Sequence, residues 1–334
     1  MPSPTTLPEA PASLDAIRAP VEADLKAFRG VFRDAMRSRV KLLDVVVQYV
    51  LKRKGKEIRP TLVLLAAELA GGSTDKTLRA AALVELLHTA TLVHDDVVDE
   101  ADTRRGVASV NALWKNKVGV LLGDYLLSRG LLLSLDAGDY DLLHVMSDAV
   151  RRMSEGEIMQ LQTSRTTGVT EAQYYEIISD KTASLIAACL AAGATSAGAD
   201  PEAVGRARAI GEEIGLAFQI RDDLFDYDAD GAVGKPIGLD LQDRKMTLPL
   251  ILALDAAEPG EARRIRKTVR RKKKSRDEVR RVLDFVDRAG GVAGARRRMV
   301  RHAERASELL HAFPPSDARD ALDALCAYVV ARKR

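Results

Sequence analysis

Two short stretches of the sequence, LVHDDVVDEADTRRG (92–106) and FQIRDDLFDYDAD (218–230), each place three carboxylates within five residues. The carboxylates of these two DDxxD motifs belong to Asp95, Asp96 and Asp99, and to Asp222, Asp223 and Asp226. Like charges one helical turn apart repel each other by a few tenths of a kcal/mol. Magnesium binds one or two such oxygens and fills its other positions with water and substrate phosphate oxygens. Although a single motif is typical of a solvated helix end, two together predict Mg²⁺ ions held against a diphosphate.

Helical spacing extends each motif into a polar stripe. At 100° per residue, the first stripe spans about 80° of its helix; it contains His88, Thr91, Asp95 and Asp99. The second spans about 60° and contains Gln219, Asp222 and Asp226, with Asp223 at its edge. Asp96 points about 100° away from Asp95, so its direct role is the least defined.

Basic residues that suit phosphate binding lie in short motif-like contexts. They are Lys56 and Arg59 in GKEIRP, Arg104 and Arg105 in RRG, Lys181 beside Thr182 in SDKTAS, Lys235 in GKPIG and Lys245 in RKMTLP. Arginine binds phosphate in a bidentate fashion, whereas lysine acts as a point charge. A surface ion pair explains any one of them, but not their occurrence together with both DDxxD motifs. Since no GxxxxGK[ST] follows a strand, a helical diphosphate site is predicted.

In family order, these motifs resemble the trans-isoprenyl diphosphate synthases, or polyprenyl synthetases. The resemblance covers about residues 45–250 and comprises GKxxRP, HxxxLxHDDxxD, RRG, GDYLL, KT, FQxxDD, GK and KxTLP. It implies an isoprenoid-synthase helical bundle with a central active-site cavity, and a homodimer. Two positions depart from the family pattern, because Glu57 stands where arginine is common and Arg244 where glycine is common.

The resemblance also implies a head-to-tail prenyltransferase that condenses isopentenyl diphosphate with an allylic diphosphate such as farnesyl or geranylgeranyl diphosphate. The six motif aspartates would bind about three Mg²⁺ ions. The allylic diphosphate would be held by Arg104, Lys181, Thr182, Gln219, Lys235 and Lys245. Isopentenyl diphosphate would be held by Lys56, Arg59, His88 and Arg105. The residues expected to carry catalysis are Asp95, Asp99, Arg104, Lys181 and Asp222.

The length of the product depends on the residues that precede the first motif. Ala90 and Thr91 stand about one turn before Asp95, where short-chain members of the family commonly carry bulky aromatics. A medium- or long-chain synthase, such as an octaprenyl diphosphate synthase, is therefore expected. We expect the stripe of Asp124, Ser128, Leu131 and Leu135 to line the deeper tunnel. Short-chain synthesis and a subunit of a heteromeric synthase are the alternatives.

The composition predicts one all-α domain. The 334 residues are 46% apolar, 30% charged and only 4% aromatic, and strand-like alternation is nowhere sustained. After a Pro-rich leader at 1–12, expected to be disordered, helical periodicity runs from 13 to 334. Turn-forming clusters interrupt it at 70–77, 100–106, 135–141, 164–170, 197–201, 230–238, 257–261 and 312–317.

Charge and cysteine content exclude several classes of protein. The net charge of +3 gives no global attraction to nucleic acid, and the basic run 263–281 is interpreted as a solvated helical surface. Cys189 and Cys326 are expected to be buried thiols. The sequence begins without a signal-peptide pattern, so we expect a cytoplasmic protein with no stable membrane insertion and with product release at a membrane surface.

Overall fold

The structure is a computed structural model that describes residues 13–52, 55–104, 106–163, 168–227 and 238–332; of Arg104 it describes the backbone only. Apart from a two-residue antiparallel pair, β1 (Thr103–Arg104) and β2 (Val107–Ala108), its regular elements are helices. The predicted all-α fold is confirmed. The predicted breaks in the described ranges fall between helices, because they contain the Gly, Asp and Ser residues that favour turns and caps.

The elements follow in chain order. They are α1 (Leu14–Arg18), η1 (Ala19–Val21), α2 (Glu22–Ala35), α3 (Lys41–Leu51), α4 (Ile58–Leu69), α5 (Asp75–Val98), α6 (Val110–Leu135), α7 (Tyr140–Thr163), α8 (Glu171–Ile178), η2 (Ser179–Ala183), α9 (Ser184–Ser196), α10 (Pro201–Phe225), α11 (Leu239–Gln242), α12 (Leu248–Ala256), α13 (Pro259–Val269), α14 (Arg276–Arg288), α15 (Gly291–Leu310) and α16 (Asp317–Ala331). The pair β1–β2 lies between α5 and α6.

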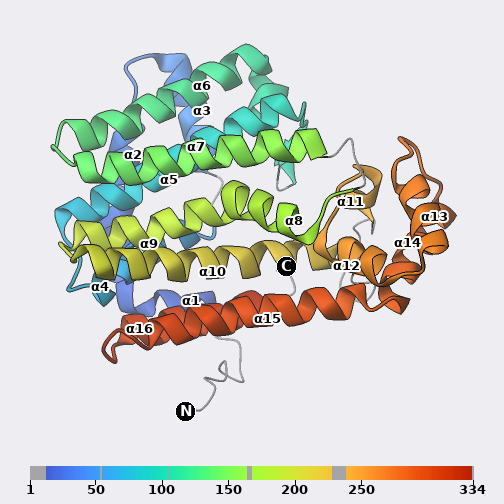
Figure 1. The fold of residues 1–334 in the computed structure, drawn as a ribbon. Helices are drawn as coiled ribbons and strands as arrows, with labels where there is room; N and C mark the ends of the chain where they lie inside the picture. The colour runs from blue at the N-terminus through green and yellow to red at the C-terminus, as the bar shows by residue number, and fades with distance from the viewer. Residues whose placement is uncertain (1–12, 53–54, 105, 164–167, 228–237, 333–334) are drawn as a thin grey trace.

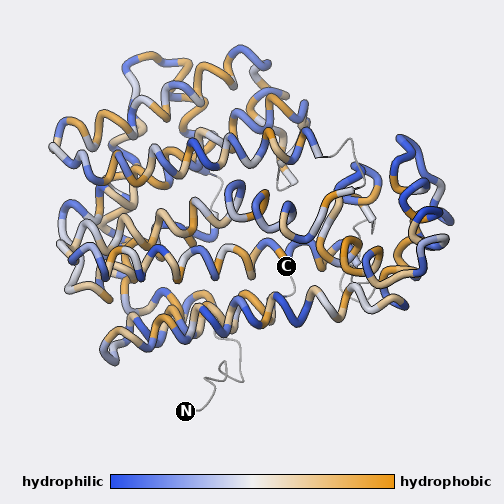
Figure 2. The backbone as a smooth tube through the Cα atoms, viewed as in Figure 1, coloured by the Kyte–Doolittle hydropathy of each residue, from blue (hydrophilic) through white to orange (hydrophobic). Residues whose placement is uncertain are grey.

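Long helices lie in layers around α9 (Figure 1). Helix α9 is apolar on all sides and packs on α4, α7 and α10, while α15 covers the other face of α10. One buried cluster runs from Ile17 in α1 to Val329 in α16. Figure 2 shows the resulting pattern, with apolar residues toward the interior of the layers and polar residues toward their outside. Cys189 and Cys326 are buried and form no disulfide, as predicted.

Capping residues in the local sequence fix the N-termini of the two helices that carry the DDxxD motifs. Thr74 caps α5 in a reciprocal capping box with Thr77, and Asp200 caps α10 immediately before Pro201. These residues satisfy amide groups that a helix N-terminus leaves without intrahelical partners. Since both helices run for more than six turns from a defined start, the position of each C-terminal motif relative to the core is set by helix length and packing.

By length and composition alone, α6 and the continuous stretch Glu171–Ser196 could span a membrane. The second stretch is 78% buried in its most apolar window, as expected of a core helix. The corresponding window of α6 is 33% buried. Length and composition therefore do not by themselves indicate a membrane span.

Candidate active site

Both DDxxD motifs lie at the C-terminal ends of long helices. Asp99 is the C-cap residue of α5, and Asp226 is the C-cap residue of α10. The C-terminus of a helix carries partial negative charge, so a carboxylate there is disfavoured by about 0.3–1 kcal/mol. Positive charge near the carboxylates at these two helix ends would therefore be favourable, and a bound metal ion would provide it.

Within each motif, the middle aspartate is buried and its neighbours are more accessible. Asp96 is 3% exposed and Asp223 is 6% exposed. Asp95 and Asp99 are exposed, whereas Asp222 and Asp226 are partly exposed. The two motifs therefore divide in the same way, into flanking carboxylates that a ligand can reach and a central carboxylate held in the protein.

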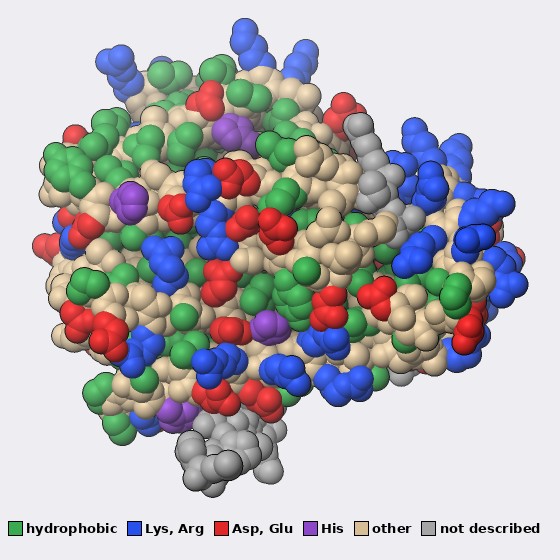
Figure 3. Space-filling view, in the orientation of Figure 1, with side chains coloured by type: hydrophobic (Ala, Val, Ile, Leu, Met, Phe, Trp, Pro, Cys, Tyr) green, Lys and Arg blue, Asp and Glu red, His purple; other side chains and the backbone are tan. Residues whose placement is uncertain are grey.

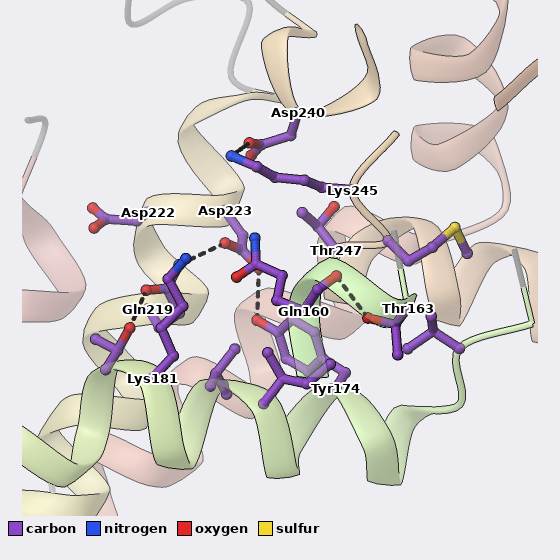
Figure 4. Close-up of a pocket in the computed structure, with 15 residues that line it drawn as sticks. Gln160, Thr163, Tyr174, Lys181, Gln219, Asp222, Asp223, Asp240, Lys245 and Thr247 are labelled. Atoms are coloured by element: carbon purple, nitrogen blue, oxygen red, sulfur yellow. Dashed lines mark hydrogen bonds and ion pairs between the residues drawn. The ribbon is translucent and has the colours of Figure 1, made fainter. Parts of the chain in front are cut away.

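A cavity of about 320 Å³ opens beside the second motif (Figure 4). Elements α7, α8, η2, α10 and the segment from α11 to α12 contribute its walls. The polar lining side chains are Gln160, Thr163, Tyr174, Lys181, Thr182, Gln219, Asp222, Asp223, Asp240, Lys245 and Thr247. Six of the predicted diphosphate and metal residues, from three separate parts of the sequence, meet here: Lys181, Thr182, Gln219, Asp222, Asp223 and Lys245.

A hydrogen-bonded chain fixes the centre of this cavity. Tyr174 Oη donates to Asp223 Oδ2 at 2.7 Å, and Gln219 Nε2 donates to Asp223 Oδ1 at 2.9 Å. Thr182 Oγ1 in turn donates to Gln219 Oε1 at 2.8 Å. Because both carboxylate oxygens of Asp223 have donors, the orientation of this side chain is set before any ligand binds (Figure 4).

Burial raises the pKa of Asp223 to about 7, although the hydrogen bonds from Tyr174 and Gln219 oppose the shift. Burial also raises the pKa of Asp222 and that of Asp226. Each shift means that burial disfavours the ionised carboxylate more than its partners in the protein stabilise it. A cation bound by these groups would supply compensating charge.

Lys181 and Thr182 lie in η2, a π-helical turn, of the kind often found at functional sites. Lys181 Nζ is 2.5 Å from Glu157 Oε2 on α7. Helix α7 approaches closely because residue 156 is glycine: a Cβ there would lie 2.6 Å from the backbone nitrogen of Lys181. Thus Gly156 allows α7 to pack against the turn that carries the two polar residues.

Lys245 enters the cavity from the turn before α12 and lies 3.0 Å from Asp240 Oδ1. The preceding Arg244 has a φ of +61°, in the left-handed region that favours glycine. This conformation gives a physical reason for glycine at that position in the family pattern. The arginine in this chain adopts the same kind of turn and leaves Lys245 in the cavity.

Asp222 and Asp226 are engaged by parts of the chain far from α10. Arg332, at the end of the described chain, forms an ion pair with Asp222 and stacks on Phe218 at 3.9 Å. The carboxylate of Asp226 accepts backbone N–H groups from Gly238, Leu239 and Asp240 at 2.9–3.1 Å. These contacts stabilise the two carboxylates when no metal is bound.

Of the residues assigned to isopentenyl diphosphate, the described ones lie near the start of α4 and on α5, and none of these lines the cavity. Lys56 is exposed, Arg59 is partly buried and His88 is buried. Glu57 adopts a φ of +45° and forms an ion pair with Arg29 of α2 at 2.8 Å, so its departure from the family pattern adds no uncompensated negative charge.

Three of the predicted basic side chains cannot be placed. Arg105 and Lys235 lie outside the described residues, as does the predicted leader at 1–12, and the side chain of Arg104 is not described. Asp95, Asp96, Asp99 and Asp226 are described but do not line the cavity. In the described part of the chain no three acidic, His or Cys residues form a ready-made metal cage. Magnesium bound partly by phosphate oxygens does not need one.

The predicted tunnel stripe on α6 stays a prediction, since the described cavity lies beside the second motif and not along α6. Ser128 is exposed and Leu135 is 45% exposed, and neither lines the cavity. The face of α6 that packs on α5 instead carries small residues, because a Cβ at Gly123 would overlap His94 and one at Gly130 would touch Leu83. The 100° rule groups residues on a face, but only packing shows which face is buried.

Sequence reasoning missed several residues that the fold brings to the site. They are Gln160 and Thr163 on α7, Tyr174 on α8, Asp240, Thr247 and the C-terminal Arg332. Thr247 belongs to the KxTLP motif, in which only the lysine was assigned a role. For the residues outside the motifs, the available signal was the polarity of Gln160 and Thr163 near the end of an otherwise amphipathic helix.

Together, an all-α fold with two carboxylate-bearing helix ends and a cavity lined by lysines and aspartates is the arrangement expected of a helical enzyme that binds an anionic substrate through a divalent cation. The sequence model of the polyprenyl synthetase family matches residues 40–286. The chain belongs to this family, and it is a polyprenyl diphosphate synthase, a prenyltransferase. The expectation drawn from the motifs is confirmed.

Similar proteins cover nearly the whole chain. The octaprenyl diphosphate synthase of Escherichia coli K12 is 36% identical over 323 residues, which are 96% of this chain and 100% of that protein. A short chain isoprenyl diphosphate synthase of Methanothermobacter thermautotrophicus is 35% identical over 293 residues, 86% of this chain and 89% of the relative. Among solved structures, a polyprenyl synthase from Caulobacter crescentus CB15 was crystallised with calcium and isoprenyl diphosphate. Its superposition on this chain has a TM-score of 0.88, with 35% sequence identity, and covers 98% of this chain and 100% of that one.

Proposed function

We propose that the chain makes a medium- or long-chain all-trans polyprenyl diphosphate by adding isopentenyl diphosphate head to tail to an allylic diphosphate such as farnesyl diphosphate. The observation that carries the diphosphate chemistry is the cavity where Lys181 and Lys245 meet Asp222 and Asp223. Two cationic side chains beside carboxylates suit a diphosphate bound through a divalent cation. The similar protein from Caulobacter crescentus, crystallised with calcium and isoprenyl diphosphate, supports the same assignment.

The residues fit magnesium, since the six motif aspartates offer hard oxygen ligands. Asp95, Asp99, Asp222 and Asp226 are the accessible ligands, and the buried Asp96 and Asp223 support them. About three ions, as the family pattern implies, would neutralise the negative charge that develops on the departing diphosphate. Lys181, Lys245 and the hydroxyl of Thr182 contact the same group, and they stabilise it more strongly as the allylic bond breaks.

The second substrate binds through its own basic residues. Lys56, Arg59, His88 and Arg105 hold the diphosphate of isopentenyl diphosphate, so that its terminal double bond is oriented toward the allylic carbon. The new carbon–carbon bond forms as the allylic carbon–oxygen bond breaks. A proton is then lost to the released diphosphate, which restores a double bond and completes one five-carbon extension.

The proposal of a longer product rests on Ala90 and Thr91. Ala90 is 3% exposed and packs with Leu86, Leu122 and Leu126, while Thr91 is partly buried and donates to the carbonyl of His88 at 2.8 Å. No bulky aromatic side chain stands at either position to stop a growing chain next to the first motif. The full-length similarity to an octaprenyl diphosphate synthase supports a longer product. A short-chain synthase of similar identity is the reason for testing the short-chain alternative.

An elongation assay tests the proposal. The purified chain is incubated with isopentenyl diphosphate, farnesyl diphosphate and Mg²⁺, and the products are separated by length. We expect products longer than geranylgeranyl diphosphate and no turnover with EDTA. Products that end at farnesyl or geranylgeranyl diphosphate would establish the short-chain alternative. No elongation by the chain alone would point to a subunit of a heteromeric synthase.

We also infer a homodimer formed through the outer face of α6. Four large apolar side chains of this helix are 41–56% exposed: Leu113, Val120, Leu121 and Leu132. Exposed apolar side chains grouped on one helix are typical of a subunit contact. Leu42 and Val45 of the neighbouring α3 are also more than half exposed. Light scattering should give a dimer for the wild type and a monomer for the double variant Leu121→Glu, Leu132→Glu. A wild-type monomer would contradict the inference.

A further inference from the structure

Positive charge is concentrated on one helical hairpin that the proposed chemistry does not use. We call residues 263–281, which comprise most of α13, the turn after it and the first part of α14, the basic hairpin. Residues 263–281 contain twelve basic and two acidic side chains, a net charge of +10. Since the whole chain carries only +3, the remainder carries −7. The protein is therefore electrically polarised, with an acidic body and one strongly basic end.

The basic side chains of the hairpin point mainly to solvent. Ten of the twelve are exposed: Arg263, Arg264, Lys267, Arg270, Arg271, Lys272, Lys273, Arg276, Arg280 and Arg281. Figure 3 shows Lys and Arg side chains gathered over this end of the molecule. Its apolar residues Val269 and Val279 face inward, where they form a small core with Val282 and Phe285 of α14 and with α11 and α12. The exposed surface therefore offers charge and no apolar anchor.

The acidic residues in the segment do little to neutralise this surface. Glu278 accepts the N–H of Ser275 at 2.9 Å in a capping box and pairs with Arg271, so it fixes the turn between the helices. Asp277 is exposed in the first turn of α14. The turn is thus locked by one carboxylate, while the neighbouring cations stay directed outward.

The basic hairpin is joined to the walls of the active-site cavity. Val279 of α14 packs so closely on Gly238 that a Cβ there would lie 2.4 Å from its Cγ1. Gly238 begins the short segment whose N–H groups bind Asp226. Farther along, Lys245 and Thr247, before α12, line the cavity. An external surface that binds the hairpin would therefore also lie close to the active-site cavity.

We infer that the basic hairpin docks on membranes that contain anionic lipids. Ten outward cations match a surface of negative phosphates, and the acidic body is repelled from it, so the molecule is oriented with the hairpin toward the lipid. The choice of a membrane rests on the proposed function, because a long prenyl diphosphate is an amphiphile that partitions into a bilayer. Residues 263–281 contain no aromatic side chain on which a nucleic-acid base could stack.

Vesicle flotation tests the inference with the full-length protein. We expect binding to vesicles of phosphatidylcholine with phosphatidylglycerol, and none to phosphatidylcholine alone. Binding should be present at about 0.1 M salt and lost at about 1 M, where the Debye length falls to about 3 Å. Undiminished binding at high salt, or equal binding to neutral vesicles, would overturn the inference.

Two matched fourfold variants locate the binding surface. The hairpin variant carries Arg270→Gln, Lys272→Gln, Lys273→Gln and Arg276→Gln. The control variant removes four exposed charges elsewhere, through Lys26→Gln, Arg33→Gln, Arg39→Gln and Lys41→Gln. A basic residue near an anionic surface strengthens binding by about fivefold, so the hairpin variant should lose about a hundredfold or more. An equal loss in both variants would contradict a site on the hairpin.

Elongation in detergent separates this inference from the proposed function. Both variants should keep wild-type turnover there, which also shows that they fold. A chain that elongates but does not float refutes docking, whereas a chain that floats but does not elongate refutes the synthase proposal and leaves the docking surface intact. A raised KM for isopentenyl diphosphate with unchanged flotation would assign the hairpin to substrate attraction. Tighter binding to nucleic acid than to vesicles would also count against a lipid surface.

Discussion

Tyr174 Oη donates a hydrogen bond to Asp223 Oδ2 at 2.7 Å, across 49 residues of sequence and inside the protein. The bond links α8 to the central carboxylate of the second DDxxD motif. Gln219 occupies the other oxygen of that carboxylate at 2.9 Å. Asp223 is therefore a fixed support between Asp222 and Asp226, and its role should be separable from theirs.

Replacing Tyr174 with phenylalanine should weaken magnesium use. The change removes one donor to Asp223 without opening a large cavity, and loss of such a supporting hydrogen bond typically costs about 10–100-fold in metal affinity or activity. The measurement is the Mg²⁺ dependence of elongation. The matched control is Tyr175→Phe, whose hydroxyl lies 3.3 Å from His302 and does not line the cavity. Equal behaviour of the two variants would count against a positioning role for Tyr174.

Asp223→Asn should stabilise the metal-free protein at pH 8. Its pKa is raised to about 7 in the folded state from 3.8. The folded protein therefore binds more protons between these values, and its stability falls as the pH rises from about 4 to 7. Asparagine removes the buried charge, with a gain of roughly 2–4 kcal/mol at pH 8. Urea unfolding in EDTA should show a gain that shrinks toward pH 5. A gain independent of pH would disprove this account.

Asp95 and Asp96 should respond differently to the same substitution. Asp95 is exposed, so Asp95→Asn should lower turnover by roughly 100-fold or more through lost electrostatic stabilisation, with little change in stability. Asp96 is 3% exposed and has polar partners in the protein, so Asp96→Asn should cost about 1–3 kcal/mol of folding free energy. Thermal melts and elongation rates are measured on both variants. A loss of stability in Asp95→Asn and a loss of turnover without destabilisation in Asp96→Asn would contradict these roles.

Thr91→Phe should shorten the product. An aromatic ring one helical turn before Asp95 would fill the space into which we propose the prenyl chain grows. Tyr140→Ala is the control, because Tyr140 is 66% exposed and does not line the cavity. Product lengths from both variants decide the matter: an unchanged distribution for Thr91→Phe removes this turn from chain-length control.

Gly156→Ala should damage the site through the backbone. The added methyl would lie 2.6 Å from the amide nitrogen of Lys181, which forces α7 and η2 apart. We expect a loss of about 1–3 kcal/mol from overpacking together with reduced activity. Gly205→Ala is the control, since a Cβ there meets nothing within 4 Å, and it should stabilise α10 by up to about 1 kcal/mol. Stabilisation by both changes would contradict the packing argument.

The sequence alone was sufficient for features that depend on local geometry. Turn residues and helical periodicity predicted the all-α fold and its breaks, because caps and helix spacing act over a few residues. The same spacing identified both DDxxD motifs, and the order of the basic motifs indicated the family. These inferences needed no knowledge of which helices touch.

Only the tertiary structure determined which of these residues meet and which faces are buried. The pairs Tyr174–Asp223 and Arg332–Asp222 join positions 49 and 110 residues apart, and no periodic rule relates such positions. Likewise, residues such as Ser128 and Leu135 share a helical face by spacing, yet the glycines of α6 decide that another face packs on α5. Side-chain volume at helix contacts, which acts across the whole fold, sets these relationships.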